Sequence, residues 1–331
     1  MEKIRWGIIG TGNISHTFAQ GLSGLDDAVL VAVASRTREK AEAFAAEMGA
    51  KRAYGTYEEL ARDGAVDVIY IGVPHTEHYE CAMLCIQHGK NVLCEKPFTL
   101  NAEYSQNLVA AAQKHNTFLM EAMWTKCLPV IQKVKEWVDQ GTIGELKNIN
   151  ASFGFYARRE EESRLYNLNL GGGALLDVGI YPIMLSQYLL GKGPDRILSD
   201  AVIGPTGVDE YNQMVFCYGE PATECMANLQ SAIMAESGTD AAIYGENGKI
   251  VIPDFYRAQV AFRYDTEGNL LETCHIPHKV NGYEYEAMEV GNCLRNGKKE
   301  SSKHSLQDTV ELAAVMDDIR REWGLVYPQE C

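Results

Sequence analysis

The first 120 residues alternate short apolar runs with helix-forming stretches, and this alternation restricts the fold more than any other feature. The apolar runs are typical of buried parallel strands and span residues 4–9, 29–34, 68–71, 91–94 and 117–120. Helix-like stretches begin at Asn13 and cover residues 38–48, 78–88 and 101–115. Strands and helices in this order predict a doubly wound parallel sheet.

After Glu121 the pattern changes. An amphipathic helix is predicted over residues 128–138, and strand-like runs follow at 222–234, 240–244 and 258–264. Glu246-Asn247-Gly248 is typical of a hairpin turn, and Ser305 to Asp308 resembles a capping box that opens a final helix. We therefore expect an α/β chain whose second domain is α+β with a large, mostly antiparallel sheet. The expected domains are residues 1–122 and 123–331.

Charge and composition exclude several classes of partner. Thirty Lys and Arg residues against 45 Asp and Glu residues give a net charge of −15, which disfavours nucleic acid and anionic membranes. No apolar run approaches the length of a membrane-spanning helix, and the N-terminus does not resemble a signal peptide. The nine cysteines form no C-x-x-C pair, so we expect buried free thiols and a cytoplasmic protein.

A glycine-rich turn lies between the first predicted strand and the first predicted helix. It reads Gly10-Thr11-Gly12-Asn13-Ile14-Ser15. Glycine allows a tight turn and a close approach of the backbone to a pyrophosphate, while the helix N-terminus offers free N–H groups. Ser15 stands where the fingerprint has its third glycine, and it is small enough for close helix–strand packing. The segment predicts dinucleotide binding, and the alternative is a structural turn.

The end of the second strand indicates which dinucleotide. An acidic residue about 20 positions after the fingerprint selects NAD, because it holds the ribose 2′-hydroxyl. This chain has no acid there and instead carries Ser35, Arg36 and Arg38. These side chains can bind a 2′-phosphate, so NADP is the predicted cofactor and NAD the alternative. The competing interpretation is that Arg36 and Arg38 are solvated residues at a helix start.

Two further segments carry groups capable of acid–base chemistry. Lys96 directly follows a strand and precedes Pro97, at the edge of a parallel sheet where ligands bind. Gly171-Gly172-Gly173 leads into an apolar helix in which Asp177 and Tyr181 share one face, and Pro182 predicts a kink there. Taken alone, a lysine at a strand end is more often solvated than catalytic, and Asp177 and Tyr181 could be a capping acid and a core residue. His75 and His78 predict a contact at a helix start beside the cofactor rather than a metal site.

Several of these segments occur together in a fixed order. They are Gly7 to Gly12, Ala34 to Arg36, Val73 to His78, Glu95 to Phe98 and Gly171 to Tyr181. In this order they resemble the glucose-fructose oxidoreductase/inositol dehydrogenase/MocA family of nicotinamide-dependent oxidoreductases, over nearly the whole chain. Residues 121–125 and 171–177 resemble most closely the branch with dimeric dihydrodiol dehydrogenases and NADP-dependent D-xylose dehydrogenases. That branch has Arg and Phe where this chain has Lys126 and Cys127, so we expect a different pocket wall.

The resemblance implies roles for individual residues. Lys96 would lie beside the nicotinamide and the reacting oxygen, Tyr181 would be the acid/base, and Asp177 would orient the substrate. An adjacent ammonium favours the phenolate form of a tyrosine, which can accept the alcohol proton. The expected cofactor contacts are Gly10, Thr11, Gly12, Asn13, Ile14, Ser35, Arg36, Arg38, Pro74, His75, His78, Glu95 and Lys96. The expected substrate contacts are Lys96, Trp124, Arg164, Tyr166, Asn167, Asp177 and Tyr181.

The resemblance also implies an activity and an assembly. The activity is NADP-dependent hydride transfer to or from a secondary alcohol of a sugar, polyol or cyclic diol. Two alternatives stay open: glycoside cleavage by transient oxidation with tightly held NAD, and a cofactor-binding sensor without turnover. The first domain is then a Rossmann domain, and the second binds substrate. The second domain also dimerises, because its open sheet face needs a cover, and we expect a homodimer or a dimer of dimers.

Overall fold

The computed structural model describes residues 3–220 and 225–331 of the chain. The chain divides into two compact units. The first comprises Met1–Cys127 and His278–Ala313, and the second comprises Leu128–Pro277 and Ala314–Cys331. Each unit is described by itself.

The first unit is built on a six-stranded parallel sheet with the strand order β3-β2-β1-β4-β5-β6. Five of its strands match the apolar runs of the sequence within two residues. A short sixth strand, β3, was not predicted, because three residues with an exposed arginine carry no clear periodic signal. The strands are β1 (Ile4–Ile9), β2 (Ala28–Ala34), β3 (Arg52–Tyr54), β4 (Val68–Ile71), β5 (Asn91–Glu95) and β6 (Leu119–Ala122).

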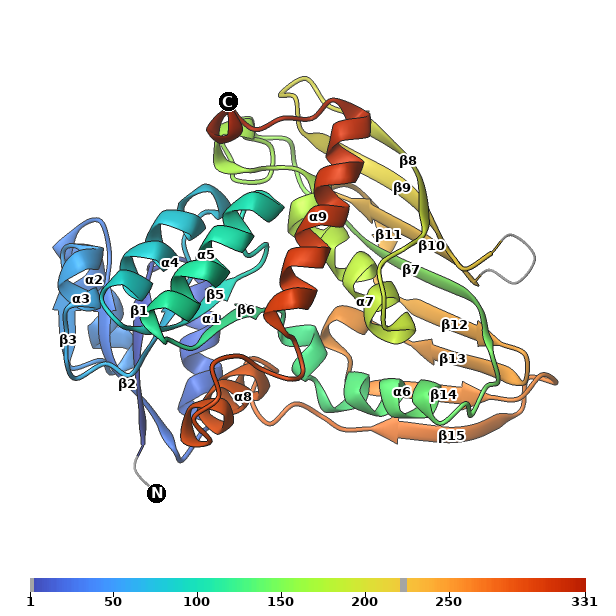
Figure 1. Cartoon of the computed structure of the whole chain (residues 1–331), viewed down its shortest axis with the longest axis horizontal. Coiled ribbons are helices and arrows are strands. Elements are labelled where there is room, and N and C mark those ends of the chain that lie inside the picture. Colours follow the sequence, from blue (N-terminus) through green and yellow to red (C-terminus); the bar gives the residue numbers. More distant parts are fainter. Residues whose placement is uncertain (1–2, 221–224) are drawn as a thin grey trace. The chain divides into compact units, whose positions relative to one another are not determined.

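Helices cover both faces of this sheet (Figure 1). On one face, Trp6 and Ile8 of β1 pack with Phe18 and Phe44 from α1 and α2. On the other face, Ile9 and Ile69 pack with side chains from α3, α4 and α5. The helices are α1 (Asn13–Ser23), α2 (Arg38–Met48), α3 (Tyr57–Ala61), α4 (His78–Gln87) and α5 (Ala102–His115). This arrangement confirms the doubly wound fold.

The first unit is not continuous in sequence, which differs from the expected division into 1–122 and 123–331. Helix α8 (Glu284–Arg295) packs on the sheet of the first unit, and its residues Ala287, Val290 and Cys293 share a core with Trp6 and Phe18. Long-range packing of this kind leaves no mark on the local pattern of α8, so a single boundary was the simplest expectation. The first half of α9 (Leu306–Trp323) also belongs to the first unit.

The second unit contains a nine-stranded sheet with the order β15-β14-β13-β12-β7-β10-β9-β8, and β11 pairs with β7. Only β7 and β10 run parallel among the pairs described, so the expected mostly antiparallel sheet is confirmed. Residues 222–224 of the predicted strand 222–234 lie outside the described residues. The strands are β7 (Leu146–Tyr156), β8 (Arg196–Ile203), β9 (Asp209–Tyr218), β10 (Cys225–Ala232), β11 (Met234–Gly238), β12 (Ala241–Gly245), β13 (Gly248–Ile252), β14 (Val260–Tyr264) and β15 (Leu270–His275).

One face of this sheet is covered by α6 (Pro129–Asp139) and α7 (Ile180–Leu190), which pack against its strands (Figure 1). On the other face, the exposed side chains near the centre include Asn150 and Asn228, which hydrogen-bond at 2.8 Å. The segment Leu168–Leu190 has the length and apolar character of a membrane-spanning helix. The sequence analysis did not predict such a segment. However, 83% of its most apolar window is buried inside the fold, as in a core helix.

Candidate functional site

The glycine turn lies between β1 and α1, as predicted. Gly10 has a φ of +98°, and a side chain there would place its Cβ 2.4 Å from the carbonyl oxygen of Gly72, so only glycine fits. Gly12 precedes the first residue of α1, and a Cβ there would meet nothing within 4 Å. The first turn of α1 has no side-chain cap and no acidic residue. Its free N–H groups therefore fit a phosphate group, which supports a dinucleotide at this end of the sheet.

Ser15 takes the place of the third fingerprint glycine. Its side chain is fully buried, and its hydroxyl donates to the carbonyl oxygen of Gly72 at 3.4 Å. A Cβ on Gly72 would lie 2.6 Å from the Ser15 hydroxyl oxygen, so α1 and the end of β4 approach closely. The small serine preserves the close packing that the fingerprint requires.

The predicted 2′-phosphate residues follow β2. Ser35 is buried, and its hydroxyl lies 3.3 Å from that of Thr11 in the glycine turn. Arg36 and Arg38 are exposed, and each contacts a carboxylate: Arg36 lies 3.3 Å from Glu77, and Arg38 lies 3.0 Å from Glu42. Such exposed pairs are weak, so both guanidinium groups remain available to a phosphate.

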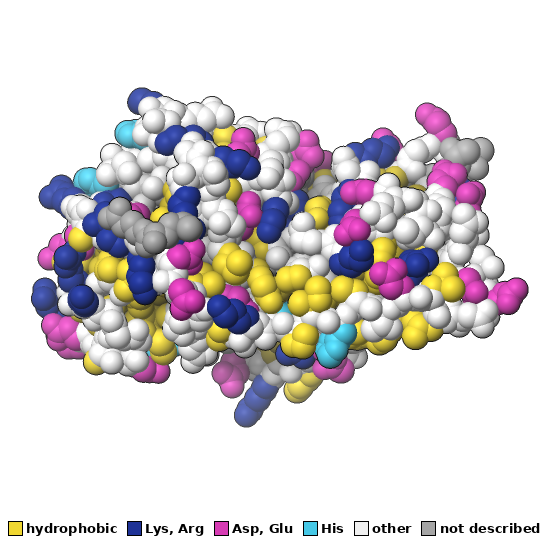
Figure 2. All heavy atoms as spheres, turned by 90° about the horizontal axis from the view of Figure 1, so that it is seen from below, with side chains coloured by type: hydrophobic (Ala, Val, Ile, Leu, Met, Phe, Trp, Pro, Cys, Tyr) yellow, Lys and Arg dark blue, Asp and Glu magenta, His cyan; other side chains and the backbone are white. Residues whose placement is uncertain are grey.

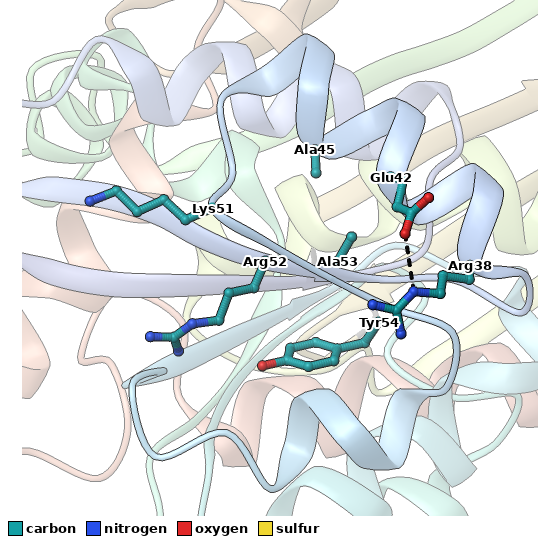
Figure 3. A pocket seen from close by; sticks show the side chains of 7 residues that line it. All are labelled: Arg38, Glu42, Ala45, Lys51, Arg52, Ala53 and Tyr54. Atoms are coloured by element: carbon teal, nitrogen blue, oxygen red, sulfur yellow. Dashed lines mark hydrogen bonds and ion pairs between the residues drawn. The ribbon is translucent and has the colours of Figure 1, made fainter.

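Arg38 also lines a surface cavity of about 470 Å³ between α2 and β3. Figure 3 shows its guanidinium beside Glu42, while the side chains of Lys51 and Arg52 extend away from it along the edge strand. Arg52 is bound to Asp63 at 2.6 Å, so this cation is already neutralised. The part of the cavity near Arg38 is therefore the part that can extend the cofactor site.

Lys96 follows the last residue of β5, as expected. The preceding Glu95 is buried, accepts a hydrogen bond from the Tyr70 hydroxyl at 2.6 Å, and accepts another from the backbone N–H of Lys96 at 3.2 Å. Burial raises the pKa of Glu95 to about 7, and the Lys96 ammonium opposes this rise. Glu95 thus holds the Lys96 backbone from inside the fold.

The segment before α4 presents Pro74 and His75, which are half-buried, and His78, which is fully buried. The His78 ring contacts two backbone carbonyl oxygens, that of Pro97 at 2.8 Å and that of Val73 at 3.0 Å. Burial lowers its pKa, and the neutral ring can donate to only one of these carbonyls at a time. His78 therefore ties the loop before α4 to the loop that carries Lys96.

Metal chemistry has no visible site near these histidines. Within residues 3–220 and 225–331, no group of three or more His, Cys, Asp or Glu side chains could hold a metal ion.

In the second unit, Tyr181 lies near the start of α7 and is 4% exposed. Its ring packs 5.4 Å from that of Phe153 and 5.9 Å from that of Tyr256, between centroids. The turn before α7, η4 (Leu175–Gly179), is π-helical and ends before Pro182, which lies inside α7. π-Helical turns inside helices are frequent at functional sites.

Asp209 holds this turn through a hydrogen bond to its backbone, and the sequence did not predict this role. It is fully buried, and its Oδ2 accepts hydrogen bonds from the backbone N–H of Leu175 and from the side chain of Asn212, both at 2.8 Å. Gly173 has a φ of +120°, and a Cβ there would lie 2.3 Å from Asp209 Oδ1. Burial raises the pKa of Asp209 to about 7. The glycine run thus lets the π-helical turn sit against a buried acid.

Asp177 and Arg164, both predicted substrate contacts, form an ion pair. Arg164 Nη1 donates to Oδ1 of Asp177 at 2.8 Å, and Nη2 donates to Oδ2 at 3.3 Å. The Asp177 side chain is 6% exposed and that of Arg164 is 57% exposed. The fork geometry fixes the carboxylate while leaving most of the guanidinium accessible.

The other predicted substrate contacts have clear packing roles. Trp124 is 5% exposed and stacks on Tyr283, with ring centroids 4.4 Å apart. Tyr166 is buried, and its hydroxyl lies 2.9 Å and 3.0 Å from the carbonyl oxygens of Ala157 and Ile233. The side chain of Asn167 accepts from the backbone N–H of Asn169 at 2.9 Å. Tyr166 and Asn167 therefore order the loop that carries Arg164.

Lys126 and Cys127 are buried within the first unit. The Lys126 ammonium donates to Asp308 at 2.8 Å, and burial raises the pKa of the Cys127 thiol. Nearby, the buried Glu121 accepts from His304 at 2.7 Å and from the Phe98 backbone at 3.0 Å. Sequence reasoning missed this network because its members lie about 180 residues apart, and only the Ser305 capping box marked the region.

The opposite edge of the parallel sheet has its own cavity, of about 700 Å³, at the start of β1 and β5. Five basic side chains line it, but Arg5 is bound to Asp67 and Arg295 to Asp27. On the face seen in Figure 2, Lys and Arg side chains alternate with Asp and Glu side chains over the described residues.

Family models match most of the chain. The model of an oxidoreductase family with an NAD-binding Rossmann fold, Gfo/Idh/MocA, matches residues 4–123, and that of the family's C-terminal domain matches residues 131–251. The chain belongs to the Gfo/Idh/MocA oxidoreductase family. It is therefore an NAD(P)-binding oxidoreductase, which favours an enzyme over a sensor.

Curated relatives cover almost the whole chain. It is 38% identical to the trans-1,2-dihydrobenzene-1,2-diol dehydrogenase of Xenopus tropicalis, over 98% of this chain and 99% of that protein. It is 33% identical to the enzyme of the same name from Homo sapiens, over 99% of each chain.

Solved structures share the fold at lower identity. A 3-ketoreductase from Actinomadura kijaniata, in complex with NADP and TDP-benzene, is 23% identical, with a TM-score of 0.84 and coverage of 97% and 98%. An aldose-aldose oxidoreductase from Caulobacter crescentus is 21% identical, with a TM-score of 0.86 and 97% coverage of each chain. At these identities the likeness supports the two-part fold.

Proposed function

We propose that this protein is an NADP-dependent dehydrogenase that oxidises a secondary alcohol of a vicinal diol, with cyclic dihydrodiols as the first substrates to test. The identity of 33–38% to dihydrodiol dehydrogenases over nearly the whole chain carries the choice of substrate class. Sugars and polyols belong to the same chemical class, because they also present adjacent hydroxyl groups.

The cofactor choice is supported by the end of β2. A carboxylate there would repel a 2′-phosphate, and the chain instead has Ser35, whose hydroxyl contacts Thr11 of the glycine turn, followed by Arg36 and Arg38. The uncapped N-terminus of α1 suits the pyrophosphate, and Thr11, Asn13 and Ile14 lie beside it. The bound nicotinamide supplies the redox chemistry as acceptor or donor of hydride.

The chain itself supplies proton transfer and positioning. Tyr181 is the proposed base: its hydroxyl oxygen accepts the proton of the reacting alcohol as hydride leaves the carbon. Lys96 is the proposed partner, because an ammonium favours both a phenolate and a developing alkoxide. Asp177, fixed by Arg164, is proposed to orient the second hydroxyl group of the diol through its carboxylate.

We also propose a homodimer or a dimer of dimers in the cytoplasm. The nine-stranded sheet leaves a face with exposed amide side chains, such as Asn150 and Asn228, that suits pairing with a second copy. All nine cysteines are free, as in a reducing compartment.

The test is a substrate panel of trans-dihydrodiols, aldoses and polyols assayed with NADP⁺ and NAD⁺ by cofactor absorbance. We expect the highest kcat/KM with NADP⁺ and a dihydrodiol. A tightly bound NAD that survives purification and is not consumed would instead favour glycoside cleavage. Tight NADP binding with no reduction on any substrate would contradict the proposed activity.

A further inference from the structure

Glu286, on α8, is a buried acid for which the proposed reaction has no use. Its side chain is 0% exposed, and neither carboxyl oxygen has a hydrogen-bond partner among the residues that the structure describes. An ionised carboxylate without partners is strongly unfavourable in a protein interior, whereas a protonated carboxyl is tolerated. The geometry therefore favours a neutral Glu286.

Its surroundings connect it to the loop that carries Lys96. Helix α8 packs on η2 (Trp124–Cys127) and on α1, and its residues Ala287 and Val290 share a buried core with Tyr70. The Tyr70 hydroxyl donates to Glu95, and burial together with the charges of Glu95 and Glu286 raises the pKa of Tyr70. Tyr70 is thus hydrogen-bonded to Glu95 and shares its core with Ala287, the residue that follows the buried Glu286 on α8.

Glu95 and Glu286 differ in what stabilises a charge on them. Glu95 accepts hydrogen bonds from Tyr70 and from the Lys96 backbone, and the Lys96 ammonium lowers its pKa. Glu286 accepts no such hydrogen bond among the described residues. Its burial, and to a smaller extent the charge of Glu95, raise its pKa well above the usual range. Two buried like charges cannot be close at low cost, so above about pH 7 the charge belongs to Glu95 and the proton to Glu286.

We propose that Glu286 is a positioning residue of the candidate active site: as the protonated member of a carboxyl pair, it leaves one negative charge on Glu95, which holds the Lys96 backbone. The inference rests on the proposed role of Lys96. A second charge, on Glu286, would repel the Glu95 carboxylate and disturb its hydrogen bonds to Tyr70 and Lys96.

Few other titratable groups face Glu286. On η2, burial and then the charge of Glu286 raise the pKa of the Cys127 thiol, and Lys126 donates a hydrogen bond to Asp308. On α1 the single titratable group is His16, which contacts Glu47. The other titratable groups of α8 are Glu284, Tyr285, Glu289, Cys293 and Arg295, and Tyr283 precedes its first residue.

The first experiment compares the thermal stability of wild type and Glu286→Gln between pH 5 and pH 9. The folded state keeps the Glu286 proton, while the unfolded chain loses it above about pH 4.3. We therefore expect wild type to lose stability relative to the variant as pH rises, about tenfold in folding constant per pH unit, until the folded pKa is reached. Each unit corresponds to roughly 2–4 °C in Tm. Glu286→Met, apolar and similar in shape, should show the same trend.

Glu289→Gln is the matched control, with the same change on the same helix. The Glu289 carboxylate accepts from the Ser301 hydroxyl at 2.6 Å and lies 3.3 Å from the Lys303 ammonium. These contacts lower its pKa even though burial opposes them. The control should therefore lose stability relative to wild type above about pH 5, the opposite sign. If Glu286→Gln behaves like this control, Glu286 is ionised and the proposal is wrong.

The second experiment measures the pH profile of kcat/KM. We expect the wild-type kcat/KM to fall at alkaline pH, with its midpoint at the pH where the Tm difference between wild type and variant levels off. In Glu286→Gln this alkaline fall should move to higher pH by at least one unit. An unshifted limb would overturn the positioning role. Failure of the proposed function is distinguishable, because full turnover in Lys96→Met would remove Lys96 from the reaction without changing the stability series.

Discussion

At the scale of single residues, a few basic side chains determine the proposed cofactor preference of this acidic chain. Arg36 and Arg38 are exposed cations in a chain with a net charge of −15, and each already contacts a carboxylate. A phosphate carries more charge than Glu77 or Glu42 and can accept several hydrogen bonds from a guanidinium fork. The proposed NADP preference therefore depends on these two side chains.

Removing both guanidinium groups should separate the two cofactors. In the double variant Arg36→Ala/Arg38→Ala we expect NADP affinity to fall roughly 10- to 100-fold, because charge-assisted hydrogen bonds are lost, while NAD affinity changes less than about threefold. Titration calorimetry with each cofactor measures this. Arg62→Ala, which breaks a similar exposed pair with Glu58 on α3, is the control. Equal losses for NADP and NAD would contradict the assignment.

Asp209 gives a second prediction at this scale. Its folded pKa, about 7, lies above the unfolded value near 3.8, so its contribution to stability declines as pH rises between these values. Asp209→Asn keeps an acceptor for the Leu175 N–H and should be more stable than wild type above pH 7, by up to about 4 kcal/mol, but not at pH 4. Urea unfolding across this pH range is the measurement. An Asn variant less stable than wild type at pH 8 would contradict the raised pKa of Asp209.

Sequence reasoning located residues whose role depends on their neighbours along the chain. Gly10 and Lys96 directly follow strands that the apolar pattern already marked, and Ser15 lies in the first turn of the helix predicted to begin at Asn13. Asp209 and Glu286 gave no such signal. Their importance comes from burial against segments far away in sequence, and an acid near other acids predicts only a solvated side chain.

At the scale of elements, each unit contains one short turn with predicted site residues. The turn between β1 and α1 exposes helix N–H groups, and the π-helical turn η4 carries Asp177. The sequence predicted both segments from their glycines. Helix α8 was not among the predicted elements, and its place in the first unit depends on packing against segments far away in sequence.

The two glycines of the first turn should respond differently to alanine. Gly10→Ala puts a Cβ at positive φ and against the Gly72 carbonyl, so we expect a loss of roughly 1–3 kcal/mol in stability or more. In Gly12→Ala the added methyl group meets no other atom, so the free energy of unfolding should stay within about 0.5 kcal/mol of the wild-type value. Its methyl group would nevertheless block the pyrophosphate, so NADP should bind at least about tenfold more weakly. Unchanged NADP binding by Gly12→Ala would argue against cofactor at this turn.

At the scale of the whole molecule, the open face of the nine-stranded sheet leads to a prediction about the oligomeric state. We expect sedimentation at micromolar concentration to give at least twice the monomer mass of 36.7 kDa. Asn228→Glu, which places like charges on the exposed face in both copies, should yield monomers. Glu236→Gln, on β11, changes an exposed side chain by one charge and serves as the control. Wild type that sediments only as a monomer would contradict the proposed dimer.

The central claim is that Tyr181 and Lys96 transfer the proton while NADP takes the hydride from a diol carbon. The most direct measurement is the rate of NADPH formation from trans-1,2-dihydrobenzene-1,2-diol by wild type, Tyr181→Phe and Lys96→Met, with NADP affinity measured in parallel. We predict turnover by wild type and a loss of about 10²- to 10⁴-fold in each variant, with NADP affinity changed far less. Near-wild-type turnover in Tyr181→Phe would contradict the account.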